Sequence, residues 1–180
     1  MSWPYWGQQV KDTIDRVHEE FMQCALQQAQ EALAAGEFPV GCVIVQAGKI
    51  VANGARLNSS VELCELDHAE IVALRSLQKD RPDIDLSQVT VYSTMEPCLM
   101  CYATLIVNGV RHIVYGYEDA MGGGTNLQLN TLSPLYRTID MKITGHILRK
   151  ESLELFQQFF RDESNTYLKG TLLAEYTLQQ

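Results

Sequence analysis

His68-Ala69-Glu70 and Pro97-Cys98-Leu99-Met100-Cys101 are the two stretches that decide how this chain folds and what chemistry it carries. Histidine nitrogen and cysteine sulfur are common ligands of Zn²⁺, and three such ligands leave the fourth tetrahedral position to water. Each stretch is predicted to begin a helix. Two helix starts that face each other across the end of a sheet would bring His68, Cys98 and Cys101 to one point, as an open, catalytic zinc site requires.

The second stretch is suited to a pair of metal ligands. Pro97 fits the first turn of a helix, where its missing N–H costs no hydrogen bond. Cys98 and Cys101 are then three residues apart and share one face of the helix. The partial positive charge of a helix N-terminus favours the thiolate, which is the form that binds metal. We therefore expect a helix over 97–107 that presents both sulfurs to one ion.

Cys64 offers a competing arrangement. It lies four residues before His68, so Cys64, His68, Cys98 and Cys101 could form a closed Cys₃His site with a structural role. That alternative gives no part to Glu70, a carboxylate close to the expected metal and suited to general acid–base work. Loss of Cys64 would release zinc from a closed site and leave it bound to an open one.

The composition is that of one globular domain. The chain has 180 residues, of which 46% are hydrophobic, so we expect residues 1–180 to form a single domain with 161–180 as a C-terminal extension. No apolar stretch approaches the 18 residues of a membrane span. The N-terminus lacks the basic and apolar regions of a secretion signal. Five cysteines, two of them at metal spacing, favour reduced thiols and a cytoplasmic location.

The order of predicted elements indicates an α/β sandwich. Strands are expected at 40–45, 50–55, 89–93, 111–115 and 141–144, and helices at 10–35, 68–79, 97–107 and 151–161. Gln46-Ala47-Gly48-Lys49 joins the first two strands as a hairpin. Because helices separate the later strands, the sheet should be mixed and covered by helices.

From about Phe21 to Phe160 the chain resembles the cytidine deaminase-like superfamily, in the branch of bacterial tRNA adenosine deaminases and purine-base deaminases. Phe38-Pro39-Val40-Gly41 is similar to the start of a strand in that family. The stretches 68–75 and 94–101 resemble its two metal motifs. The resemblance implies a three-layer α/β/α sandwich with a central mixed five-stranded sheet, a catalytic Zn²⁺, hydrolytic deamination and a homodimer.

The resemblance also implies a role for each site residue. His68, Cys98 and Cys101 would be the zinc ligands, and zinc would give hydroxide at neutral pH by lowering the pKa of its water to about 7. Glu70 would pass the proton of that water to a ring nitrogen and then to the departing amine. Asn58 is placed like an asparagine that contacts the base or ribose.

Asp67 has two possible roles. It adds negative charge beside the expected pocket, where it could bind a substrate amino group. It could equally cap the helix that follows.

Three departures from the tRNA deaminase pattern bear on the substrate. Glu65-Leu66-Asp67 replaces a small or proline-containing run, and Met121-Gly122-Gly123-Gly124 replaces a lysine-containing loop. The net charge is −8, from 14 basic and 22 acidic residues. Residues 161–180 hold two basic and three acidic side chains, which gives +2 − 3 = −1.

A phosphate backbone is normally bound by a basic surface. We therefore expect a small nucleobase or nucleoside as substrate. The first alternative is a tRNA-specific adenosine deaminase that converts wobble adenosine to inosine, which the charge disfavours. The second is a non-catalytic zinc-binding subunit.

Overall fold

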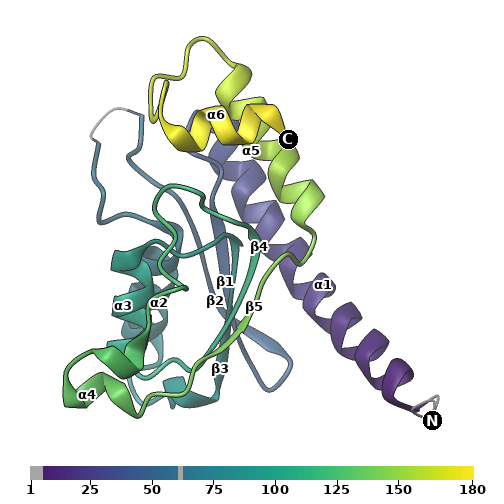
Figure 1. The fold of residues 1–180 in the computed structure, drawn as a ribbon, viewed down its shortest axis with the longest axis vertical. Coiled ribbons are helices and arrows are strands. Elements are labelled where there is room, and N and C mark those ends of the chain that lie inside the picture. Colours follow the sequence, from purple (N-terminus) through teal and green to yellow (C-terminus); the bar gives the residue numbers. More distant parts are fainter. Residues whose placement is uncertain (1–5, 61–62) are drawn as a thin grey trace.

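The computed structural model describes residues 6–60 and 63–180, which form one five-stranded sheet with helices on both faces (Figure 1). The strands are β1 (Gly41–Gln46), β2 (Lys49–Ala55), β3 (Val89–Met95), β4 (His112–Tyr117) and β5 (Lys142–Thr144). The helices are α1 (Trp6–Ala34), α2 (Ala69–Asp80), α3 (Leu99–Val107), α4 (Pro134–Arg137), α5 (Arg149–Arg161) and α6 (Leu172–Gln179). Residues 1–5 lie outside the described ranges. The prediction that the N-terminus is not a secretion signal concerns these residues.

The strand order β2-β1-β3-β4-β5 makes the sheet mixed, as predicted. Strand β1 is antiparallel to β2 and β3, whereas β3, β4 and β5 run parallel. The predicted hairpin is confirmed. Its two turn residues, Ala47 and Gly48, have φ angles of 49° and 75°, a combination that matches the twist of the two strands it joins.

Alternating side chains of β1 separate the two layers of the core. Cys42 and Ile44 pack with α2 and α3 on one face of the sheet. Val43 and Val45 pack on the other face against α1, where Met22 is completely buried. Because both faces are covered, the strand is apolar throughout rather than alternating with polar residues. The predicted three-layer α/β/α sandwich is confirmed.

Two glycines allow the helices to approach the sheet closely. A Cβ at Gly54 in β2 would clash with the backbone of α2, at the carbonyl oxygen of Ala69 and the nitrogen of Ala73. A Cβ at Gly41 in β1 would clash with the backbone of α1 in the same way. Backbone atoms cannot move aside as a flexible side chain can. Gly54 therefore fixes the depth at which α2, and the residues at its start, rest on the sheet.

The last twenty residues are part of the packed structure. Helix α6, which the sequence analysis did not predict, buries Leu173 and Ala174 against the core. Thr177 is fully buried, and its hydroxyl lies 3.2 Å from the hydroxyl of Tyr117 in β4. Figure 1 shows α6 lying at one end of the sheet, whereas α5 runs down its flank beside α1. None of the helices in the described ranges combines the length and apolar character that a membrane span needs.

A cluster of polar side chains lies near the amino ends of the parallel strands β3 and β4. His18 of α1 is buried, with Nδ1 3.0 Å from the Tyr92 hydroxyl. The ring of His112 lies 5.6 Å from that of His18, and its Nδ1 is 3.0 Å from the Thr90 hydroxyl. Burial and the positive charge of Lys142 lower the pKa of His112 to about 4. Burial also lowers the pKa of His18, although Asp15 partly opposes this effect.

These histidines should make the fold sensitive to acid. In the unfolded chain histidine titrates near 6.5, so between about pH 6.5 and 4 the unfolded state binds more protons and folding stability falls as the pH is lowered. His112→Asn should flatten this decline in the free energy of unfolding, measured by urea denaturation, by about 2 kcal/mol after allowance for solvent screening. The control is His146→Asn, at a histidine whose side chain is 58% exposed. An equally steep decline in His112→Asn would contradict the assignment.

Candidate functional site

His68 lies immediately before α2. The helix begins at Ala69, one residue later than predicted, and His68 is its N-cap residue with an extended backbone, φ −63° and ψ 146°. Its side chain makes no capping hydrogen bond, so the imidazole is free to face away from the helix. The carbonyl of His68 accepts the first helical hydrogen bond, from Val72, at 2.9 Å.

Cys98 has the same position relative to α3. The prediction that Pro97 occupies the first helical turn is wrong: the helix begins at Leu99, and Cys98 is the extended N-cap residue. The carbonyl of Pro97 accepts a hydrogen bond from the backbone of Gly124 at 2.9 Å, whereas the carbonyl of Cys98 bonds to Tyr102 at 2.8 Å. Helical bonding therefore starts one residue beyond the proline.

The two helix starts bring the three expected ligands together. The Sγ atoms of Cys98 and Cys101 each lie 3.5 Å from Nδ1 of His68, and the three donor atoms are all within 4.8 Å of one another. Hydrogen bonds from Cys101 and His68 lower the pKa of Cys98 to about 4, which favours its thiolate. Two sulfurs and one imidazole nitrogen that converge at this spacing are a donor set suited to tetrahedral Zn²⁺.

Cys64 does not join this cluster. Within residues 6–60 and 63–180 the group of converging donors consists of His68, Cys98 and Cys101. The carbonyl of Cys64 accepts a hydrogen bond from Arg56 at 2.8 Å, and its N–H donates to the carbonyl of Asn58 at 2.8 Å. The geometry thus favours three protein ligands over a closed Cys₃His site.

Glu70 is buried next to the cluster, with 3% of its surface exposed. The Ser93 hydroxyl donates to Oε1 at 3.1 Å, and Oε2 lies 3.5 Å from Sγ of Cys101. Burial in the protein interior raises the pKa of Glu70. Ser93, at the end of β3, was not predicted as a site residue, because its contact with Glu70 depends on how α2 crosses the sheet.

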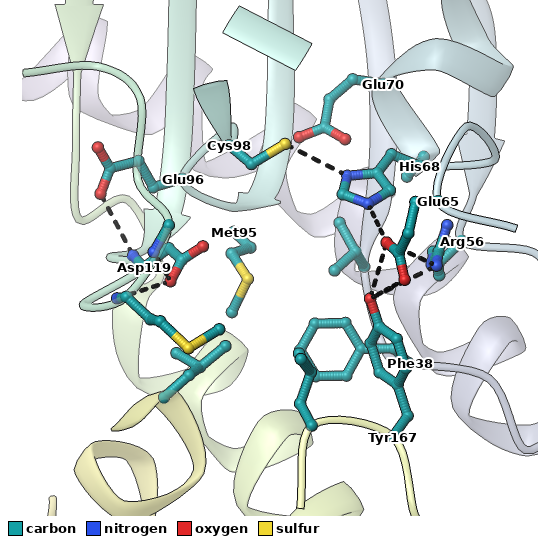
Figure 2. Close-up of a pocket in the computed structure, with 16 residues that line it drawn as sticks. Phe38, Arg56, Glu65, His68, Glu70, Met95, Glu96, Cys98, Asp119 and Tyr167 are labelled. Carbon is teal, nitrogen blue, oxygen red and sulfur yellow. Dashed lines mark hydrogen bonds and ion pairs between the residues drawn. The ribbon is translucent and has the colours of Figure 1, made fainter. Parts of the chain in front are cut away.

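His68, Glu70 and Cys98 open into a cavity of about 240 Å³ (Figure 2). Phe38 and Met95 form part of its wall, and Tyr167, Leu168 and Leu173 of the C-terminal segment form another part. The contribution of the C-terminal segment was not expected from the sequence. Ligand pockets for drug-sized molecules are roughly 300–1,000 Å³, so the cavity suits a smaller compound.

The loop 119–125 forms the opposite wall. Met121 and Gly122 line the cavity, in agreement with the predicted loop. The buried carboxylate of Glu96 holds this loop by accepting hydrogen bonds from the backbone nitrogens of Asp119 and Thr125, each at 3.2 Å. A Cβ at Gly123 would lie 2.5 Å from that carboxylate. Gly123 therefore lets the loop pack directly against Glu96.

Asn58 and Asp67 lie outside the cavity lining. The amide of Asn58 donates to the Asp67 carboxylate at 2.7 Å, and Asp67 is also 3.8 Å from Arg75. Asp67 does not cap α2, because its side chain makes no bond to the helix N-terminus. The two residues contact each other in this structure, and their role in substrate binding stays a prediction.

Comparison with known proteins agrees with the site. Residues 15–117 match the family model described as the cytidine and deoxycytidylate deaminase zinc-binding region. A tRNA-specific adenosine deaminase of Haemophilus influenzae is 32% identical over 144 residues, which are 79% of this chain and 83% of that protein.

Two solved structures share the fold. One, from a study of A-to-I editing by tRNA:A34 deaminases, is 28% identical with a TM-score of 0.63 and covers 76% of this chain and 98% of its own. The other is a variant protein in complex with 8-azaguanine. It is 25% identical with a TM-score of 0.64, and the match covers 79% of this chain and 84% of that one. The chain belongs to the cytidine and deoxycytidylate deaminase family, whose members are zinc-dependent hydrolases acting on the C–N bonds of nucleobases and nucleosides.

Proposed function

We propose that this protein removes an exocyclic amino group from a nucleobase, supplied as the free base or the nucleoside, by zinc-dependent hydrolysis. The observation that carries this proposal is the placement of Glu70. It is a buried carboxylate directly beside three converging metal donors, at a cavity of about 240 Å³. A purely structural zinc site, as in a non-catalytic subunit, has no need for such a group.

Each residue then has a defined task. His68, Cys98 and Cys101 hold zinc, which when bound makes water acidic enough to supply a nucleophile near neutral pH. Ser93 fixes Oε1 of Glu70, so that Oε2 is the oxygen on the side of the metal donors. Glu70 accepts a proton there, and its raised pKa helps it hold that proton until it is delivered to a ring nitrogen and then to the leaving amine.

The cavity lining supports a substrate without phosphate. Four carboxylates line it, from Glu65, Glu70, Glu96 and Asp119, against the single guanidinium of Arg56. Together with a volume of about 240 Å³, this charge favours a neutral base or nucleoside over a nucleotide. A relative that is 25% identical was solved with 8-azaguanine, which is a purine base analogue.

Wobble adenosine of tRNA is the second candidate substrate. The curated relatives favour it more than they favour a small substrate, because the proteins 30–32% identical over about four-fifths of this chain are named tRNA-specific adenosine deaminases. The net charge of −8 and the acidic C-terminal residues weigh against RNA binding. The same C-terminal segment forms one wall of the cavity that a flipped base would have to enter.

Ammonia release separates these candidates. We expect turnover of at least one free base or nucleoside among adenine, guanine, cytosine and their nucleosides, and at least roughly tenfold lower kcat/KM for the matching 5′-monophosphate, because the lining is acidic. The same assay uses tRNA at two salt concentrations, where RNA binding weakens steeply with salt. Turnover of tRNA alone would overturn the small-substrate proposal in favour of the second candidate.

We also propose that residues 1–180 act as one deaminase domain in a cytoplasmic homodimer. The packing of α6 on the sheet supports a single domain that includes 161–180. Sedimentation equilibrium would test the dimer.

A further inference from the structure

The two ring nitrogens of His68 have different partners. Nδ1 faces the sulfurs of Cys98 and Cys101 at 3.5 Å. Nε2 points to the other side and lies 3.0 Å from Oε2 of Glu65 (Figure 2). A hydrogen bond at Nε2 places the ring proton on that nitrogen and leaves Nδ1 with the lone pair that a metal requires.

Glu65 is itself held by two further side chains. Its Oε2 is 3.3 Å from Nη2 of Arg56, and both of its oxygens lie 3.1 Å from the hydroxyl of Tyr167. Arg56 has a side chain only 2% exposed, and it is fixed in turn by the carbonyl of Cys64 at 2.8 Å. The guanidinium carbon lies 5.5 Å from the centre of the Tyr167 ring. Glu65 is thus tied to a buried cation and to the C-terminal segment.

This network matters because Glu65 is 58% exposed. A single exposed ion pair contributes little, since both partners are solvated and must be ordered. Three simultaneous contacts, one of them to a buried arginine, restrict the carboxylate to one position. The orientation of His68 then depends on residues far apart in the sequence, Arg56 at the end of β2 and Tyr167 beyond α5.

We propose that Glu65 is a positioning residue that orients His68 for zinc, and that Tyr167 extends this support to the C-terminal segment. The inference rests on the proposed role of His68 as a zinc ligand. Partners of this kind typically contribute 10–100-fold to metal affinity. The proposal differs from a catalytic role, because Glu65 acts through His68 and not on the substrate.

Zinc affinity provides the test, measured by competition with a chromogenic chelator on the full-length protein. Glu65→Ala should bind zinc roughly 10–100-fold more weakly. Glu65→Gln should recover part of the affinity, because its amide oxygen still accepts a hydrogen bond from Nε2. Tyr167→Phe should lose less than Glu65→Ala, because Arg56 still holds the carboxylate. The matched control is Glu154→Gln, at a carboxylate 61% exposed on α5 and paired with Lys150.

A second readout separates positioning from folding. The absorption bands of the Co²⁺-substituted protein should change in Glu65→Ala and not in Glu154→Gln. The metal-free Glu65→Ala protein should still unfold in one cooperative urea transition, at a lower midpoint than Glu154→Gln because the buried Arg56 loses its ion pair. Unchanged zinc affinity in Glu65→Ala would overturn the inference and leave the proposed function intact. Absence of zinc binding in the wild-type protein would overturn both.

Discussion

Replacing Glu70 with glutamine should lower the rate of deamination by roughly 10²–10⁴-fold while zinc stays bound, because general acid–base transfer contributes about that factor. The amide has nearly the same shape as the carboxylic acid, and Ser93 can still donate to its oxygen. It cannot take a proton from water at neutral pH. We expect kcat to fall much more than KM, since the proton moves only in the reacting complex.

The measurement is ammonia release at saturating substrate, together with the zinc content of the same sample. Glu154→Gln serves as the control for the carboxyl-to-amide change on an exposed helix. If Glu70→Gln were to keep the wild-type rate, the catalytic role of Glu70 would be wrong.

Cys98→Ala should abolish both zinc binding and turnover, whereas Cys64→Ala should keep both. Cys98 is one of three converging donors, and two remaining ligands hold zinc far more weakly than three. The backbone of Cys64 bonds to Arg56 and Asn58, and alanine retains both bonds. Zinc per chain and the shift in Tm on addition of zinc would show the difference, because a metal that binds the folded state stabilises it.

The pair of variants decides between the open and closed forms of the site. Loss of zinc from Cys64→Ala would show that Cys64 becomes a ligand when metal is present. Retention of zinc by Cys98→Ala at wild-type affinity would refute the assignment of that residue.

The metal cluster could be predicted because the sequence signals that mark its residues lie close to them in the chain. His68, Cys98 and Cys101 each lie at a helix start, and helix starts are marked by short-range sequence signals. The strands were found for the same reason, since β1 and β3 are short apolar runs bounded by turns. Helices α4 and α6 were not predicted, and some predicted elements have misplaced ends, as at Pro97, whose carbonyl bonds to Gly124 and not within the helix.

The cavity wall could not be predicted, because it depends on contacts between distant segments. Tyr167 lies 102 positions beyond its partner Glu65, and nothing in residues 162–171 indicates where that turn will rest. The loop before α2 also contains left-handed residues at Asn58 and Leu63, with φ angles of 54° and 50°. Such angles redirect the chain, and neither residue is a glycine that would have marked the bend.

The predicted substrate-binding residues Asn58 and Asp67 show that closeness in the sequence does not reveal side-chain contacts. The sequence places both near His68, but it does not show that the amide of Asn58 bonds to the Asp67 carboxylate.

The C-terminal wall of the cavity also sets an order of events during synthesis. Cys101, the last metal donor, precedes Tyr167 by 167 − 101 = 66 residues. At roughly 5–20 residues per second this interval lasts roughly 3–13 s. During it a growing chain already contains all three donors and lacks the side chains that later enclose them. We therefore expect metal to reach these donors directly from bulk solution before residues 167–173 add their wall of the cavity.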